Sequence, residues 1–282
     1  MRDAQLRIQD LDLSNDQKNF LLDLIPSLQR DVGERVISVI LFGSAVKGGF
    51  SKEVSDFDMI IVVDDDVSSR QVSVLDSKVQ SLVEKHGIAS STAKGFKGIP
   101  QFIMAQTGMF TSQFICRRRD FISGTFTRIF SANPLLAKLL SPSGQVLGGV
   151  LKGSKTVHGE DLASEVKVAK PTNLDVMKSL IMNELLVGLS LFYYPLTENA
   201  TKLAMEATKW SAHMAGYMTT GESKSLAEAV EVLASKGISL DHLKRLEKLR
   251  RNYGPDLSFI FSAPKAIAGI HLSLLEGPRE YH

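Results

Sequence analysis

The sequence has little of several features that would fix its class at once. It holds a single cysteine, Cys116, among 282 residues, so neither an intrachain disulfide nor a cysteine-based zinc site can form. Its first residues lack the apolar run of a signal peptide. The longest apolar stretch, residues 185–196, is shorter than the roughly 20 residues of a bilayer span and contains Pro195, so we predict a buried helix there. We therefore expect a cytoplasmic protein without a membrane segment.

An excess of charge of one sign is also missing. The chain has 33 basic and 31 acidic residues, which gives a net charge of +2. Proteins that bind long nucleic acids normally carry a clear positive excess, and aromatic and basic residues do not interleave here. Hydrophobic residues make up 44% and charged residues 23% of the chain, which are ordinary globular values. We expect a globular protein that does not bind long nucleic acid.

The chain does contain two β-branched apolar runs joined by a polar connection, within residues 36–63. The first run ends at Gly43 and Ser44, and the second begins at Asp56 and Asp58. Alternate side chains of a strand share a face, so the two aspartates point the same way. Neighbouring carboxylates repel one another and are costly to bury without a cation, so they predict a divalent-metal site. The Gly-Ser corner offers backbone N–H groups and a hydroxyl, which suit a phosphate.

Helical and strand patterns alternate in the N-terminal part. A capping box at Ser14 opens a helix that apolar spacing carries to residue 32. In chain order we predict strands over 35–42 and 56–63, a helix over 69–86, strands over 101–105 and 111–117, a helical segment over 121–140 and a strand pair over 145–158. At the end of this strand pair, we expect His158 to be a loop histidine and not a ligand.

The pattern changes after Pro171. Apolar residues recur at helical spacing, and β-branched runs become rare. The spacing predicts an antiparallel bundle with helices over 175–194, 198–218, 224–235, 239–252 and 263–275. We therefore divide the chain into a domain of residues 1–170 and an all-α helical bundle of residues 171–282.

The central pattern resembles the nucleotidyltransferase signature of the DNA polymerase beta superfamily. That signature has a hydrophobic residue and Gly-Ser, about ten residues, and then two aspartates that alternate with hydrophobic residues; here these are residues 42–44 and 56–59. The resemblance covers residues 15–165 and implies an α+β fold with a mixed β-sheet flanked by helices. Residues 157–162, followed by the bundle, resemble the layout of aminoglycoside-type nucleotidyltransferases. That layout implies an acceptor between the two halves.

This resemblance implies transfer of a nucleoside monophosphate from a nucleoside triphosphate (NTP) to a hydroxyl of a small molecule, with release of pyrophosphate. Two magnesium ions, bridged by Asp56 and Asp58, would stabilise the charge that develops. Gly43 would let the backbone approach the phosphates. A hydrogen bond from Ser44 would reach the β- or γ-phosphate. In the connection between the strands, Lys47 and Lys52 either approach the triphosphate or are simply solvated.

The sequence departs from the family pattern in one respect. Active members usually have a third carboxylate on a later strand, and the strands predicted over 101–105 and 111–117 contain no acid. Gln101 and Gln113 lie on them instead. Four acids elsewhere are candidates to replace the third carboxylate: Asp120, Glu160, Glu198 and Glu206.

Two other functions stay open. The acceptor could be a protein or an RNA, in which case the arginines at 117–119 and 250–251 would make the basic contacts. Alternatively, the missing acid indicates a degenerate nucleotide-binding regulator or antitoxin without catalysis. For residues 117–119 themselves, we weigh a solvated surface cluster against one or two arginines that face a triphosphate or an acceptor anion, because arginine suits bidentate phosphate contacts.

Overall fold

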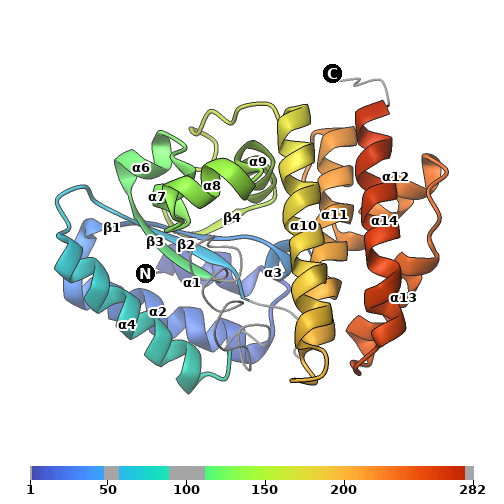
Figure 1. Ribbon diagram of the computed structural model, residues 1–282. Coiled ribbons are helices and arrows are strands. Elements are labelled where there is room, and N and C mark those ends of the chain that lie inside the picture. The colour runs from blue at the N-terminus through green and yellow to red at the C-terminus, as the bar shows by residue number, and fades with distance from the viewer. Residues whose placement is uncertain (1, 48–56, 89–111, 277–282) are drawn as a thin grey trace.

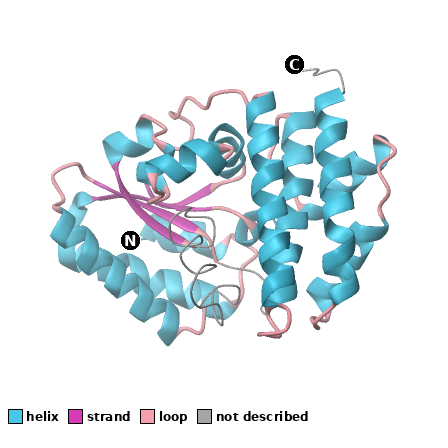
Figure 2. Ribbon diagram, in the orientation of Figure 1, coloured by secondary structure: helices cyan, strands magenta, loops and turns pink. Residues whose placement is uncertain are grey.

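The computed structural model describes residues 2–47, 57–88 and 112–276. It has a sheet with helices on both faces, followed by a set of long helices beside it (Figure 1). Every element described after residue 172 is a helix, as Figure 2 shows. The α+β class predicted from the sequence is therefore confirmed, whereas the domain boundary at residue 170 stays a prediction.

Among the described residues, the sheet has four strands: β1 (Val36–Leu41), β2 (Met59–Val63), β3 (Gln113–Arg117) and β4 (Lys155–Gly159), in the order β3-β2-β1-β4. β1 runs antiparallel to β2 and β4, while β2 and β3 are parallel, so the sheet is mixed. All five residues of β2 are buried, as its unbroken apolar run predicted.

Helices from both ends of this half cover the two faces of the sheet (Figure 1). Residues of α1 (Arg2–Gln9), α2 (Asn15–Val32) and α4 (Ser69–Lys85) form one core with one face. The other face packs against α6 (Arg118–Ile122), α7 (Phe126–Ile129) and α9 (Ser143–Lys152). The short elements are the 3-10 helix η1 (Gly33–Arg35), α3 (Ser44–Lys47) and α8 (Pro134–Leu140).

Two predictions about the elements of this half are wrong. The first member of the strand pair over 145–158 is the helix α9, because its apolar residues contact the core at helical spacing and its glycines lie inside the helix. The helical segment over 121–140 is three helices, since Gly124 has a φ of +64° and Asn133 caps α8. The sequence analysis missed α1, and the strand over 101–105 lies outside the described residues.

Five helices make the C-terminal half: α10 (Asn173–Tyr193), α11 (Ala200–Thr220), α12 (Leu226–Ser235), α13 (Asp241–Arg251) and α14 (Leu257–Glu276). α11 is central, because it packs against α10, α12 and α14. A buried chain of hydrogen bonds crosses this core. His271 Nε2 lies 3.0 Å from Ser179 Oγ, and the Asn183 amide donates to Ser179 and, at 3.0 Å, to Ser211.

By length and composition alone, α10 and α14 could each cross a membrane. In the fold they pack on each other and on α11 through faces that include the buried polar chain just described. Their outer faces are exposed: Ile181, Phe192 and Phe261 are 51%, 65% and 65% exposed. The prediction of a buried helix over 185–196 therefore holds for one face of α10 only.

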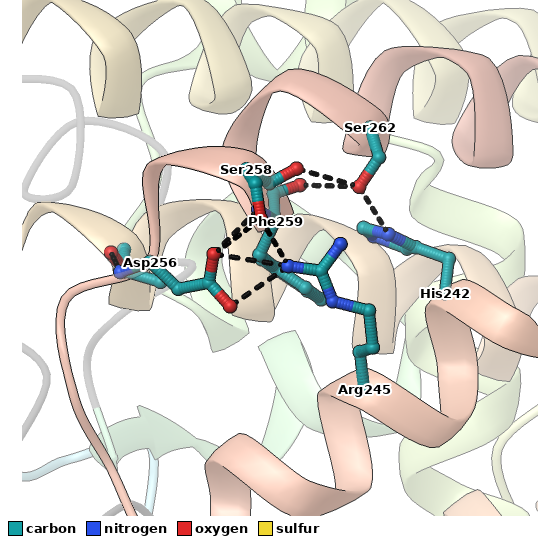
Figure 3. A network of polar contacts seen from close by, with 7 residues as sticks. His242, Arg245, Asp256, Ser258, Phe259 and Ser262 are labelled. Atoms are coloured by element: carbon teal, nitrogen blue, oxygen red, sulfur yellow. Dashed lines mark hydrogen bonds and ion pairs between the residues drawn. The ribbon is translucent and has the colours of Figure 1, made fainter.

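A polar network ties α13 to the start of α14 (Figure 3). Asp256 accepts from the Phe259 backbone N–H at 2.9 Å and caps the helix, while Arg245 donates to both of its carboxylate oxygens. His242 bridges Thr208 and Ser262, at 3.1 Å from each hydroxyl. Burial, and secondarily the positive charge of Arg245, lowers the pKa of His242 to about 4.

The two halves meet where α9 packs on α11. A Cβ built on Gly148 would lie 2.0 Å from the Tyr217 hydroxyl, so the tyrosine occupies the space that a side chain would need. Ser223 donates to the carbonyl of Gly149, and Lys152 donates to that of Gly221. Gly148 is thus a packing contact between the halves.

We predict that acid unfolds the protein through its buried histidines. Burial lowers the pKa values of His242 and His271 in the folded state, so below pH 6.5 the unfolded chain binds protons that the folded chain does not. His242 alone should remove about 2–3 kcal/mol of stability between pH 6.5 and 4. Urea unfolding at several pH values measures this loss, and His242→Gln should reduce it. An identical pH dependence in the variant would contradict this assignment.

We predict that Gly148→Ala destabilises the protein by about 1–3 kcal/mol because the methyl group overpacks against Tyr217. The matched control is Gly149→Ala in the same helix, where a Cβ meets nothing closer than 3.9 Å; it should be neutral or slightly stabilising. Adding Tyr217→Leu should remove most of the penalty specific to Gly148→Ala in a double-mutant cycle measured by thermal or urea unfolding. Equal effects of the two alanine substitutions would show that the contact is unimportant.

Candidate active site

The Gly-Ser corner and Asp58 meet at one edge of the sheet, by which we mean the strand ends where β1 stops and β2 begins. In the antiparallel pair of β1 and β2, Leu41 lies opposite Met59, so the end of the first strand adjoins the start of the second. The Phe42 N–H donates to the Asp58 carbonyl at 3.1 Å and extends this pairing beyond the strands. Strand register therefore brings together residues that are 14 or more positions apart in the sequence.

Gly43 is held against the carboxylate of Asp58. Its φ is +68°, a conformation that residues with a side chain rarely adopt, and a Cβ built on it would lie 2.2 Å from Asp58 Oδ2. The carboxylate thus fills the space beside the glycine backbone, directly before Ser44 opens α3. An oxygen ligand beside exposed backbone suits a hard cation such as Mg²⁺ together with phosphate oxygens.

Part of the predicted site lies outside the described residues, namely Asp56 and Lys52. Lys47 is the last residue of α3, three positions after Ser44. Within residues 2–47, 57–88 and 112–276, no group of three histidine, cysteine or acidic side chains could hold a metal ion. The assignment of Asp56, Asp58, Gly43, Ser44, Lys47 and Lys52 to the site stays a prediction.

Two of the candidates to replace the third carboxylate lie at the opposite edge of the sheet. β3 runs parallel to β2 and starts opposite Met59, so Asp120, which follows β3, lies beyond the far end of β2. Five residues of strand separate the two edges by about 16 Å. Glu160 follows β4 and donates its N–H to the Ile37 carbonyl, near the start of β1. Neither acid can adjoin Asp58.

The three arginines lie at this far edge too. Arg117 donates to the Val67 carbonyl, Arg118 forms an ion pair with Glu160 at 2.8 Å, and the Arg119 N–H donates to Asp65 at 3.0 Å. The alternative in which they face a triphosphate at the Gly-Ser corner is therefore wrong. They hold strand ends together, and the sequence pattern carried no signal of which edge they would occupy.

In the helical half, Glu198 and Glu206 stay candidates for the third acid. The backbone carbonyl of Glu198 accepts from the Tyr253 hydroxyl, and the carboxylate of Glu206, a residue only 8% exposed, forms an ion pair with Lys209. His158 lies on β4, not in a loop, with its Nε2 3.5 Å from the Gln29 amide. Burial lowers its pKa, so it is neutral at pH 7.

The strand beside Asp58 presents two polar residues. Gln113, noted from the sequence, is buried and donates to the Phe57 carbonyl at 3.1 Å, which fixes the residue before Asp58. Ser112 precedes it and accepts from the Met59 N–H through its carbonyl at 2.7 Å. The sequence analysis missed Ser112, because a serine before a strand is common and only the register shows its neighbour.

Comparison with known proteins agrees with this geometry. Residues 22–96, which include β1, β2 and α4, match the family model described as a nucleotidyltransferase domain. This part of the chain is therefore similar to a nucleotidyltransferase domain. No curated protein sequence matches the chain.

The fold is similar over most of its length to a solved structure. That structure is spectinomycin adenyltransferase AAD(9) from Enterococcus faecialis with ATP and spectinomycin; the identity is 15% and the TM-score 0.52. The match covers 90% of this chain and 98% of that one, so the helical half is part of the shared fold along with the N-terminal half.

We predict that Gly43→Ala destabilises the N-terminal half more than a glycine substitution of similar backbone strain. Gly87 has a φ of +64° but open space around it, so Gly87→Ala should cost only the strain, about 1–2 kcal/mol. Gly43→Ala adds a collision with Asp58 and should be worse in urea unfolding. It should also abolish any rise in melting temperature caused by Mg²⁺ and NTP, which Gly87→Ala should keep. Equal behaviour of the two variants would contradict the contact.

Proposed function

We propose that the protein is a Mg²⁺-dependent nucleotidyltransferase that moves a nucleoside monophosphate from an NTP to a hydroxyl of a small molecule. The observation that carries this proposal is the contact of Gly43 with Asp58 inside a region that matches a nucleotidyltransferase domain. The contact places a carboxylate beside a backbone corner, which is the combination that a metal-bound triphosphate requires. The buried Cys116 suits a reducing cytoplasm.

In this proposal two magnesium ions are held by Asp56 and Asp58 and by triphosphate oxygens, and they stabilise the charge that develops as pyrophosphate leaves. Residues of the chain position the triphosphate. Gly43 lets the phosphates approach the backbone, and Ser44 donates a hydrogen bond to the β- or γ-phosphate. Lys47 and Lys52 contribute positive charge near the triphosphate.

We place the acceptor between the sheet and the helical half. In Figure 1 the edge of the sheet that carries α3 faces α10. The halves are joined through α8 and α9 on one side and α10 and α11 on the other, so their relative position is fixed by packing. The similar adenyltransferase structure contains ATP and spectinomycin, which supports a small-molecule acceptor over a protein or an RNA.

One observation favours a second candidate function, a nucleotide-binding regulator without catalysis. The register places Asp120 and Glu160 away from Asp58, and the sequence has no acid between Glu84 and Asp120. A site with two carboxylates can still bind a metal-nucleotide complex. It would then lack the third oxygen ligand or base that the family pattern includes.

Transfer of label from an α-³²P-labelled NTP to a pool of small hydroxylated metabolites, with Mg²⁺ present, tests the proposal. We expect Asp58→Asn to lower the rate by roughly 10²-fold or more, because charge stabilisation at phosphorus is lost. Asp120→Asn and Glu160→Gln are the matched controls and should keep the rate, since both acids lie at the far edge.

Labelling that survives Asp58→Asn would contradict the site. Magnesium-dependent binding of NTP without transfer to any small molecule, protein or RNA would instead support the regulator.

A further inference from the structure

Ser112 directly precedes β3, beside Asp58, and its hydroxyl is buried without a hydrogen-bond partner among the described residues. The residue is only 3% exposed, and its Oγ has no hydrogen-bond partner in the described part of the chain. A buried hydroxyl without a partner costs about 1–3 kcal/mol. Such a group needs an explanation, and a ligand or ion that completes its hydrogen bonds is one.

The register places this hydroxyl on the same face as the carboxylate of Asp58. Met59 lies opposite Gln113 in the parallel pair, so the residues one position earlier, Asp58 and Ser112, are also neighbours. The Met59 N–H donates to the Ser112 carbonyl at 2.7 Å, as parallel pairing at this position requires.

Side-chain packing agrees with that direction. Phe57 and Met59 contact the core on the side of α2 and α4, so Asp58 between them points to the other face. Phe114 and Cys116 contact the core on the side of α6 and α9, and Ser112 shares their face by alternation. Gly43 flanks Asp58 on the β1 side and Ser112 flanks it on the β3 side.

We infer that the hydroxyl of Ser112 takes the place of a third acid in this site. It supplies a neutral hydrogen bond to the oxygens around a metal ion at Asp58, either to the carboxylate or to a metal-bound water. A carboxylate there would add a negative charge, and ligand charge is a main determinant of divalent-cation affinity. The site of this chain therefore has one negative charge fewer than a three-carboxylate site, and its affinity for a divalent cation is lower. This inference rests on the proposed function for the metal at Asp58.

Binding of Mn²⁺ alone to the full chain, followed by electron paramagnetic resonance of the free ion, tests the inference without any need for turnover. We expect Ser112→Asp to tighten binding roughly tenfold because it adds a charged ligand. Ser112→Ala should weaken it by about tenfold, as the loss of an outer-shell hydrogen bond typically does.

Ser141 is the matched control: it is 1% exposed, its hydroxyl also lacks a partner among the described residues, and it lies between α8 and α9. Ser141→Ala should leave Mn²⁺ affinity unchanged.

Melting temperatures keep the test decisive if a buried aspartate impairs folding. Both Ser112→Asp and Ser141→Asp should melt at a lower temperature than the wild type without metal, because each buries a charge. Mn²⁺ should restore the melting temperature of Ser112→Asp only. The inference is wrong if Mn²⁺ restores neither variant or both, or if Ser112→Ala and Ser112→Asp bind Mn²⁺ like the wild type.

Failure of the proposed metal site gives a different result. In that case Asp58→Asn would bind Mn²⁺ as tightly as the wild type, whatever the Ser112 variants do. If Asp58→Asn weakens binding while the Ser112 variants do not, the metal site stands and only the role of Ser112 is wrong.

Discussion

The site depends on one close approach, that of the Asp58 carboxylate to the backbone of Gly43. With only 2.2 Å between Oδ2 and the place of a Cβ, any other residue at position 43 would displace either the carboxylate or the corner. The positive φ of Gly43 adds a second reason for glycine. Burial of β2 on both faces and its pairing with β1 hold Asp58 there, so the core of the sheet serves to position one carboxylate.

The sheet also separates two groups of polar residues. Its edge at Asp58 carries the Gly-Ser corner, Ser112 and Gln113, whereas Arg117 and the ion pair of Arg118 with Glu160 lie at the opposite edge. Opposite ends of five-residue strands lie too far apart to share one ion. The N-terminal half therefore offers no third acid beside Asp58 within the residues that the structure describes.

Local signals in the sequence were enough to predict the helices and strands with strong hydrophobic periodicity. The capping box at Ser14, the apolar run of β2 and the long helices after residue 172 were predicted because each is set by neighbours in the chain. The segment of α9 was misread as a strand, since its packing depends on residues far away in the chain, such as Tyr217 against Gly148. The edge occupied by Arg117 and the position of Ser112 depend on strand register, which a single sequence does not encode locally.

The most direct test of the account is a crystal structure of the protein with Mn²⁺ and a non-hydrolysable NTP analogue, with the metal located by its anomalous signal. The account predicts a peak at about 2.0–2.3 Å from a carboxylate oxygen of Asp58, with the triphosphate against the backbone of Gly43 and Ser44. A nucleotide bound elsewhere, or a metal that does not touch Asp58, would contradict it.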